Sequence, residues 1–314
     1  MNSPFRIGAR ASPLSLAQTQ RVRARLATAL SLDAQAQDAA LPVLAMTTQG
    51  DRVQDRSLRD VGGKGLFTKE LDEALLAGRI DLAVHSLKDL PTILPEGIVL
   101  ACVPEREDVR DALIAPGAKS LAELPQGAVL GTASLRRAAQ ALHQRPDLRI
   151  QALRGNVQTR LDKLARGEAD ATFLALAGLK RLGLESAASA LLDPQVMPPA
   201  IGQGALAVTA RAGDARVLEM LAGLEEAQTR LAIEAERGFL RAVEGSCRTP
   251  IAAFSTWQGR HLNLLCEALT PDGRHRWRLE EGIAAPDAEG ACALGQRLGA
   301  LLRQEAGPLW PIVS

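Results

Sequence analysis

The stretch IDLAVHSLKDLP, residues 80–91, is the part of the chain that decides the fold. It begins as a short apolar run of the kind that forms a buried strand, and then turns polar at His85, Ser86, Lys88 and Asp89 before a proline. In open α/β sheets, ligands bind in the crevice beyond the carboxyl ends of the strands. The stretch therefore predicts an α/β fold with a site at this strand end, although a polar loop that merely ends the strand would give the same pattern.

Strands and helices alternate on both sides of this stretch. The hydrophobic pattern predicts strands at residues 5–8, 42–47, 98–103, 112–115, 129–131, 149–153 and 171–174. It predicts helices at residues 13–30, 66–76, 135–142 and 157–164, and a mobile, glycine-containing loop at 49–64. Alternation of this kind is typical of parallel sheets.

The last third of the chain has a different pattern. Residues 197–210 begin with a proline pair and continue as a strand, whose position suggests a return crossing into the first domain. A long amphipathic helix at 228–243 then precedes three strands, at 251–257, 262–268 and 276–283, and a helix at 292–304. This order predicts an α+β domain with a small antiparallel sheet.

Three domains follow from these shifts in pattern, because 314 residues are too many for one comfortable core. The first α/β domain is expected at residues 1–104 together with 200–222, and the second α/β domain at 105–199. The third domain, of α+β type, is expected at 223–314.

Composition argues against several classes of function. The formal net charge is +1, so no overall field would recruit nucleic acid or a membrane surface. No run approaches the ~20 apolar residues of a membrane span, and the N-terminus lacks the apolar core of a signal peptide. The four Cys and four His residues show neither zinc-ligand spacings nor a disulfide framework. We therefore expect a cytoplasmic protein without a metal site.

Arginines recur where predicted strands end or helices begin. Arg10 follows the first strand, Arg136 and Arg137 open a helix, and Arg154 and Arg160 flank the start of another. Backbone N–H groups and the helix dipole favour anions at such places, and a guanidinium binds carboxylate or phosphate bidentately. Three equivalent places favour anion binding over solvated surface arginine. Only six of the 37 Lys and Arg residues are Lys, a bias that high genomic GC content would also explain.

Two further stretches are candidates for chemistry. GGKGLF, residues 62–67, lacks the spacing of a nucleotide P-loop; its glycines suit either a lid whose Phe67 covers a site or a plain turn before a helix. Cys247 lies in the loop EGSCRTP, which makes it the most exposed of the four thiols and the best candidate for a nucleophile or an attachment point. A structural role for Cys247 fits the spacing equally well. Cys102 and Cys266 lie in apolar strands and are expected in the core.

Eight stretches together resemble the porphobilinogen deaminase, or hydroxymethylbilane synthase, family. They occur in the family's order between residues 7 and 254: IGARASPLSLAQ, GGKGLFTKEL, DLAVHSLKDLP, GTASLRR, LRGNVQTRL, FLALAGLKRLGL, AIGQGALAV and EGSCRTPIAAF. The chain departs from the family pattern at Arg248-Thr249, beside the cysteine, and at residues 207–211, which lack the acidic residue often found after GQGAL.

The resemblance implies a three-domain enzyme. Its first two domains would be like those of type II periplasmic binding proteins, and its third would carry a covalent dipyrromethane cofactor on Cys247. The family condenses four porphobilinogen molecules head to tail, releases ammonia and then frees hydroxymethylbilane. Members are usually monomeric, so a monomer is expected here.

The resemblance also implies the site residues. Asp89 would be the catalytic carboxylate, because a carboxylate near the pyrrole N–H can stabilise positive charge and help to move protons. Every pyrrole brings an acetate and a propionate, which guanidinium groups bind without losing their proton. Besides Asp89 and Cys247, the cofactor would contact Ser86, Lys88, Thr132, Arg136 and Arg137. The substrate would contact Arg10, Ser12, Lys64, Phe67, Arg154, Arg160 and Arg181.

Two other classes of function remain open from the residues alone. A pair of periplasmic-binding-protein-like domains with a regulatory third domain could hold a small anion. A transferase with a cysteine nucleophile but no bound pyrrole would explain Cys247, though not the many arginines.

Overall fold

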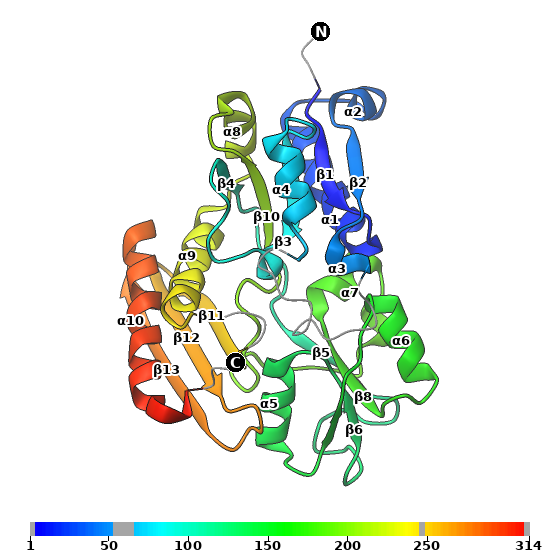
Figure 1. Cartoon of the computed structure of the whole chain (residues 1–314), viewed down its shortest axis with the longest axis vertical. Coiled ribbons are helices and arrows are strands. Elements are labelled where there is room, and N and C mark those ends of the chain that lie inside the picture. Colours follow the sequence, from blue (N-terminus) through cyan, green and yellow to red (C-terminus); the bar gives the residue numbers. More distant parts are fainter. Residues whose placement is uncertain (1–3, 53–65, 245–248, 311–314) are drawn as a thin grey trace. The chain divides into compact units, whose positions relative to one another are not determined.

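The computed structural model describes residues 4–52, 66–244 and 249–310, which form two compact units (Figure 1). The first unit comprises Met1–Glu107 and Ala205–Thr229, and the second comprises Asp108–Gly204 and Arg230–Ser314. The division of the chain into three domains stays a prediction.

The first unit contains a five-stranded mixed sheet in the order β2-β1-β3-β10-β4. β1 is parallel to β2 and β3, whereas β10 is antiparallel to both β3 and β4. β10, the strand expected within residues 197–210, enters by the return crossing and therefore runs opposite to its neighbours. The strands are β1 (Ile7–Arg10), β2 (Val43–Met46), β3 (Leu82–Ser86), β4 (Ile98–Cys102) and β10 (Leu206–Arg211).

Helices cover both faces of this sheet. α1 begins where the Ser12 side chain caps the first turn by accepting from the Ser15 N–H, with Pro13 at the first helical position. Two clusters of apolar side chains form the core, one containing Val22 of α1 and the other Leu71 of α4. The helices of the unit are α1 (Pro13–Ala29), α2 (Ala34–Ala40), α3 (Gln49–Arg52), α4 (Lys69–Leu76), the 3-10 helix η1 (Leu87–Asp89) and α8 (Ala215–Ala222).

Two sequence expectations need comment in this unit. Residues 49–64 were predicted as a mobile loop, but α3 (Gln49–Arg52) is helical, and residues 53–64 lie outside the described residues. The sequence did not suggest a purpose for Arg211. Its Nη1 donates to the backbone oxygens of Leu75 and Ile80, and its Nη2 lies 3.2 Å from an Asp81 oxygen, so it ties β10 to the segment before β3.

The second unit contains a similar five-stranded sheet, in the order β7-β6-β8-β5-β9. β6 is parallel to β7 and β8, but β5 is antiparallel to β8 and β9, so the parallel prediction is wrong for β5. The strands are β5 (Asp111–Ile114), β6 (Val129–Gly131), β7 (Arg149–Gln151), β8 (Ala171–Ala175) and β9 (Ala190–Leu191). The helices are α5 (Leu135–Gln144), α6 (Val157–Ala165), α7 (Leu176–Leu182) and the 3-10 helix η2 (Glu185–Ala187).

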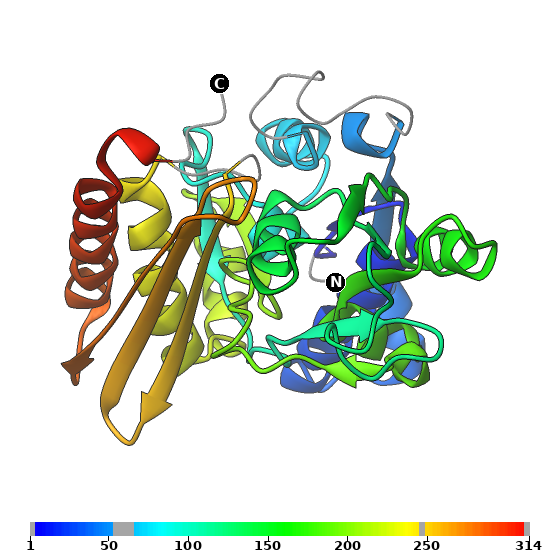
Figure 2. The same cartoon turned by 90° about the horizontal axis from the view of Figure 1, so that it is seen from below.

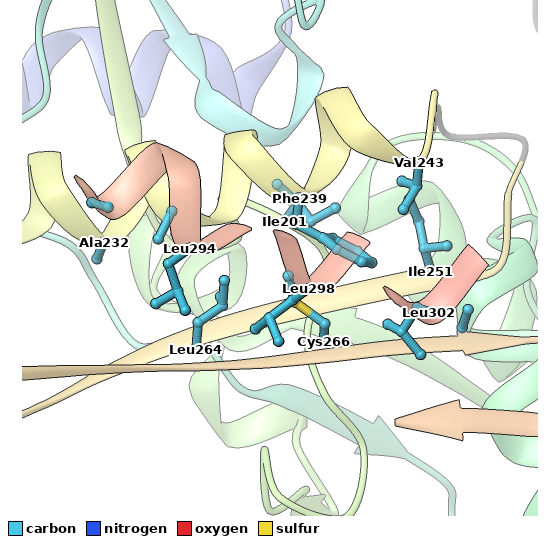
Figure 3. Packing of buried hydrophobic residues seen from close by; sticks show 14 of the residues in the cluster. Ile201, Ala232, Phe239, Val243, Ile251, Leu264, Cys266, Leu294, Leu298 and Leu302 are labelled. Atoms are coloured by element: carbon cyan, nitrogen blue, oxygen red, sulfur yellow. The ribbon is translucent and has the colours of Figure 1, made fainter. Parts of the chain in front are cut away.

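The predicted α+β region follows in the same unit and is confirmed as an antiparallel three-stranded sheet, β11-β12-β13, with α10 along one face (Figure 2). Figure 3 shows Phe239 of α9 and Leu298 of α10 gathered over Leu264 and Cys266 of β12, as a buried core requires. The elements are α9 (Ala227–Ala242), β11 (Ile251–Gln258), β12 (His261–Leu269), β13 (Arg276–Ala284), α10 (Ala288–Ala306) and the 3-10 helix η3 (Gly307–Leu309).

Glycines allow α9 and α10 to pack backbone against backbone. A Cβ atom on Gly295 of α10 would lie 1.9 Å from the Ala235 carbonyl oxygen, and a Cβ on Gly238 of α9 would lie 2.2 Å from that of Cys292. Neither carbonyl can move away without bending its helix. The two helices therefore depend on hydrogen as the side chain at both positions.

We expect Gly295→Ala to lower the free energy of unfolding by ~1–3 kcal/mol, since overpacking forces the two helices apart. Gly223→Ala is the matched control, because its Cβ would have no neighbour closer than 4.0 Å and its φ of −69° suits alanine. Urea unfolding of both variants measures the effect, and equal midpoints would contradict the close packing of α9 on α10.

Candidate functional site

A cavity in the first unit lies at the carboxyl ends of β1 and β3, as the sequence predicted for a ligand site. β1 ends at Arg10 and β3 ends at Ser86, after which η1 carries Asp89. The lining residues are Arg10, Ser12, Leu14, Ser15, Gln18, Phe67, His85, Ser86 and Asp89.

Arg10 and Asp89 face each other across this cavity. Nη1 of Arg10 lies 3.8 Å from Oδ2 of Asp89, and the Arg10 guanidinium carbon stands 4.2 Å from the centre of the Phe67 ring. The Asp89 side chain keeps 32% of its surface exposed, against 20% for Arg10. Asp89 is thus held near a cation yet remains open to a molecule that enters the cavity.

Gln18 belongs to the site, although the sequence analysis did not select it. It lies on α1, three residues after Ser15, and is 2% exposed. Its Nε2 donates to the Ser86 hydroxyl at 2.8 Å, which fixes the orientation of that hydroxyl at the cavity wall. A glutamine on a helix ordinarily suggests a solvent-exposed face. The sequence signal that could have identified Gln18 is its spacing of three residues from Ser15, which is itself three residues from Ser12.

His85 is a buried, neutral histidine. It is 4% exposed, and its Nε2 lies 3.0 Å from the Thr209 hydroxyl on β10. Burial and, to a smaller extent, the charge of Arg10 together lower the pKa of His85 to about 4. His85 therefore serves as a packed, neutral residue at the wall of the cavity.

Arg136 and Arg137 form a second group, in the other unit. Nη2 of Arg136 lies 2.8 Å from Oδ2 of Asp111, and Nη2 of Arg137 lies 2.6 Å from Oδ1 of the same carboxylate. Gln203 also donates to Asp111, at 2.8 Å. Burial alone would raise the pKa of Asp111, but the two guanidiniums outweigh it and hold the pKa below its ordinary value. Asp111 was missed by the sequence analysis, which treated its position as the edge of an apolar strand.

This arginine pair has unused hydrogen-bonding capacity. Nη1 of Arg136 donates to the Pro198 carbonyl and Nη1 of Arg137 donates to that of Phe173, both at 2.9 Å. The Nε atom of each arginine is buried and has no hydrogen-bond partner among the described residues. Two cations share one carboxylate at this place, so the donors and the charge are both suited to an additional carboxylate.

The remaining predicted residues of the second unit lie at helix starts or near the return crossing. Thr132 accepts from the Ser134 N–H at 3.1 Å, just before α5. Arg154 is half-buried before α6, and Arg160 donates from Nε to the Gly155 carbonyl at 2.9 Å. Arg181 donates from Nη2 to the Gly204 carbonyl at 2.6 Å.

Two family models match this chain. The first, "Porphobilinogen deaminase, dipyromethane cofactor binding domain", matches residues 5–219, and the second, "Porphobilinogen deaminase, C-terminal domain", matches residues 230–304. A porphobilinogen deaminase of Caulobacter vibrioides is 55% identical over 311 residues, which is 97% of this chain and 96% of that protein. One of Phenylobacterium zucineum is 54% identical over 310 residues, which is 96% of each.

The chain belongs to the porphobilinogen deaminase family. The resemblance seen in the eight sequence stretches is thereby confirmed, and so is the dipyrromethane-binding character of the family.

Solved structures of other proteins are similar at a lower level. A methionine-binding lipoprotein of Bacillus subtilis is 12% identical with a TM-score of 0.41, covering 73% of this chain and 92% of that one. A nutrient-binding protein of Burkholderia cenocepacia bound to methionine is 16% identical with a TM-score of 0.42, covering 73% and 95%. The strand orders agree with the expected fold class, which has two α/β sheets and a small antiparallel sheet.

The site residues that the family resemblance implied fall into two groups in the structure. Arg10, Ser12, Phe67, Ser86 and Asp89 line one cavity of the first unit, with Lys88 exposed beside them on η1. Thr132, Arg136, Arg137, Arg154, Arg160 and Arg181 lie in the second unit. Lys64 and Cys247 lie outside the described residues. Within the described residues, no cluster of His, Cys, Asp and Glu could hold a metal ion, and no helix is long and apolar enough to cross a membrane.

The lowered pKa of His85 predicts how the free energy of unfolding depends on pH. Between pH 6.5 and pH 4 the unfolded chain binds a proton that the folded protein does not, so the stabilising effect of neutral His85 is complete above pH 6.5 and is lost as the pH falls through about 4. We expect this one group to remove about 2 kcal/mol of stability between pH 7 and pH 5.

Urea unfolding at the two pH values tests this effect. His85→Gln can still bond to Thr209 but does not titrate, so it should lose about 2 kcal/mol less than the wild type over the same interval. Equal losses in both proteins would show that His85 is not held neutral by burial.

Proposed function

We propose that this protein is a porphobilinogen deaminase that condenses four porphobilinogen molecules head to tail on a dipyrromethane primer, releasing four ammonia and then hydroxymethylbilane. The observation that carries the proposal is Asp89 placed 3.8 Å from Arg10 in an accessible cavity, at the positions where the family has its catalytic motif. The proposal includes a monomer that works in the cytoplasm.

Asp89 is the proposed catalytic residue. Loss of ammonia from the substrate produces an electron-poor azafulvene, which is cationic when protonated, and a pyrrole ring then attacks its exocyclic carbon. A carboxylate beside the pyrrole N–H stabilises the positive charge and can accept and return a proton. The exposure of Asp89 leaves room for a ring at the carboxylate, and Arg10 stands 3.8 Å away on the other side.

Arg10, Ser12 and Ser86 are the proposed substrate-holding groups around Asp89. The Arg10 guanidinium can bind an acetate or propionate while it stays on the Phe67 ring, which limits its freedom. The Ser86 hydroxyl is oriented by Gln18, so its position is fixed before any ligand arrives. Lys88, exposed on η1, adds a further cation at the same strand end. Lys64, outside the described residues, is proposed to act with Phe67 at the lid.

Arg136 and Arg137 are the proposed binding groups for cofactor carboxylates, with Thr132 beside them at the start of α5. Their buried, unpartnered Nε atoms and shared counterion Asp111 fit such a ligand. When bound, the dipyrromethane supplies the pyrrole ring to which the first substrate unit is joined. Arg154, Arg160 and Arg181 are proposed to hold the carboxylates of added rings, because all three lie at helix ends or strand ends of the same unit.

Cys247 is the proposed attachment point, as a thioether that keeps the growing chain from dissociating. Two of the other thiols are unsuited to this role, because Cys102 and Cys266 are fully buried in strands. Burial also raises the pKa of the Cys266 thiol well above its usual value, which disfavours the thiolate.

Asp89→Asn should leave the adduct in place but reduce turnover ~10²–10³-fold, because one group that stabilises developing charge is lost. Intact mass spectrometry measures the adduct, and porphobilinogen consumption measures turnover. Glu96→Gln, an exposed carboxylate of the same unit, is the matched control and should have wild-type turnover. Wild-type turnover in Asp89→Asn would remove Asp89 from the mechanism.

Cys247→Ala should have the mass of the bare chain and give no colour with acid Ehrlich's reagent, whereas the wild type carries a dipyrromethane adduct. Cys292→Ala is the control, because Cys292 is the partly exposed thiol among the described residues and should keep the adduct. If Cys247→Ala still carries the adduct, Cys247 is not the attachment point. A bare mass in active wild-type protein would overturn the proposed function and favour an anion-binding module or another transferase.

A further inference from the structure

β12 is buried on both faces, which is unusual for a strand in a sheet of three. Leu264, Cys266 and Ala268 face α9 and α10 in the core shown in Figure 3. Alternate residues point the other way, and on that face Leu265 and Leu269 are 1% and 0% exposed. Glu267 lies between these two leucines and is 0% exposed, and Arg278 of β13 stands opposite it in the sheet.

Glu267 has only a partial set of hydrogen bonds. Its Oε1 accepts from Nε2 of Gln140 at 2.7 Å, and its Oε2 is buried with no partner among the described residues. Burial raises the pKa of the Glu267 carboxyl. A buried, half-satisfied carboxyl group costs free energy, and an apolar residue between Leu265 and Leu269 would avoid this cost. The charges of Arg278, Arg276 and Arg136 offset part of this cost, but Oε2 still has no hydrogen bond among the described residues.

Gln140 connects Glu267 to the arginine pair. Its Oε1 accepts from Nη1 of Arg136 at 2.9 Å, while its Nε2 donates both to Glu267 and to the Pro198 carbonyl, the latter at 2.9 Å. A guanidinium only donates and a carboxylate only accepts. The amide of Gln140 can therefore satisfy both neighbours in one orientation, which Glu267 and the Pro198 carbonyl both favour.

The backbone around this connection is fixed as well. Nδ1 of His143 on α5 lies 2.8 Å from the carbonyl of Gly273, in the turn between β12 and β13. Gly273 has a φ of +71°, and a Cβ there would lie 2.6 Å from the Ala139 carbonyl and from the His143 nitrogen. Because α5 meets this turn backbone to backbone, the distance from Gln140 to Glu267 is set by the packing and not by side-chain freedom.

We propose that Glu267 is a positioning residue for Arg136. Through Gln140 it holds the Arg136 guanidinium against Asp111, so that the arginine pair presents its remaining donors to a carboxylate of the dipyrromethane. This inference rests on the proposed function, which assigns Arg136 and Arg137 to that group. Glu267 itself touches neither the cofactor nor the reacting atoms in this account.

The test measures how much the adduct stabilises each variant. For every variant, the melting temperature of the adduct-bearing protein is compared with that of the same variant carrying Cys247→Ala, which has no adduct. The difference between the two is called the adduct increment. A purely structural residue lowers both melting temperatures equally and leaves the increment unchanged, whereas a positioning residue reduces the increment.

Four changes distinguish the hydrogen bond from the charge. Glu267→Leu and Gln140→Leu each interrupt the connection and should lose most of the increment. Glu267→Gln keeps an acceptor oxygen for Gln140 and should keep the increment. The double change Gln140→Leu with Glu267→Leu should lose no more than Gln140→Leu alone, since Glu267 acts only through Gln140. Glu280→Leu, an exposed residue on the neighbouring β13, is the control and should keep the increment.

Each result decides the matter. A full increment in Glu267→Leu, or a further loss in the double variant, would overturn the inference while leaving the enzyme assignment intact. A wild type that carries the adduct but shows no increment would overturn it together with the role of the arginine pair. If Glu267→Leu does not fold, Gln140→Leu and Glu267→Gln decide in its place, and equal increments in these two would overturn the inference.

Discussion

One carboxylate, that of Asp111, organises the polar interior of the second unit. It accepts from two arginines and a glutamine at the start of β5, all at 2.6–2.8 Å. Removing one partner from such a buried cluster leaves uncompensated charge, which typically costs ~3–5 kcal/mol. Arg136, one of these arginines, also donates to Gln140 and to the Pro198 carbonyl, so the cluster extends from Asp111 to the segment before β10.

The first unit handles charge in a different way. Arg10 and Asp89 are separated by 3.8 Å and both are partly exposed, so their interaction is weaker and is screened by solvent. A catalytic carboxylate must change partners during a reaction, which a loosely paired group can do. The rigid parts nearby are neutral: the Gln18–Ser86 pair and the buried His85–Thr209 pair. The protein thus contains a buried cluster of charges around Asp111 and a partly exposed pair, Arg10 and Asp89, whose members can exchange partners.

The sequence predicted most elements to within a few residues, because periodic apolar residues mark strands and helices directly. It did not predict the antiparallel direction of β5 and β10, since a strand's direction depends on where its connection arrives and not on its own residues. Gln18 and Asp111 were missed for a related reason. A glutamine on a helix and an acidic residue at a strand edge suggest solvent, and only tertiary contacts show that both are buried. Motif order, by contrast, was enough to place Arg10, Ser86 and Asp89 around one cavity.

The return crossing before β10 is held by the same side chains that are proposed to hold carboxylates. Arg136 donates to the Pro198 carbonyl and Arg181 to that of Gly204, while Glu236 accepts from the Gly202 N–H at 2.7 Å. A scan of these arginines would therefore be confounded, since truncating Arg136 or Arg181 would remove both a proposed ligand contact and a hydrogen bond to the segment before β10. Loss of activity in such a scan measures the sum of both, and assigning it to recognition alone would overstate the affinity of any single arginine.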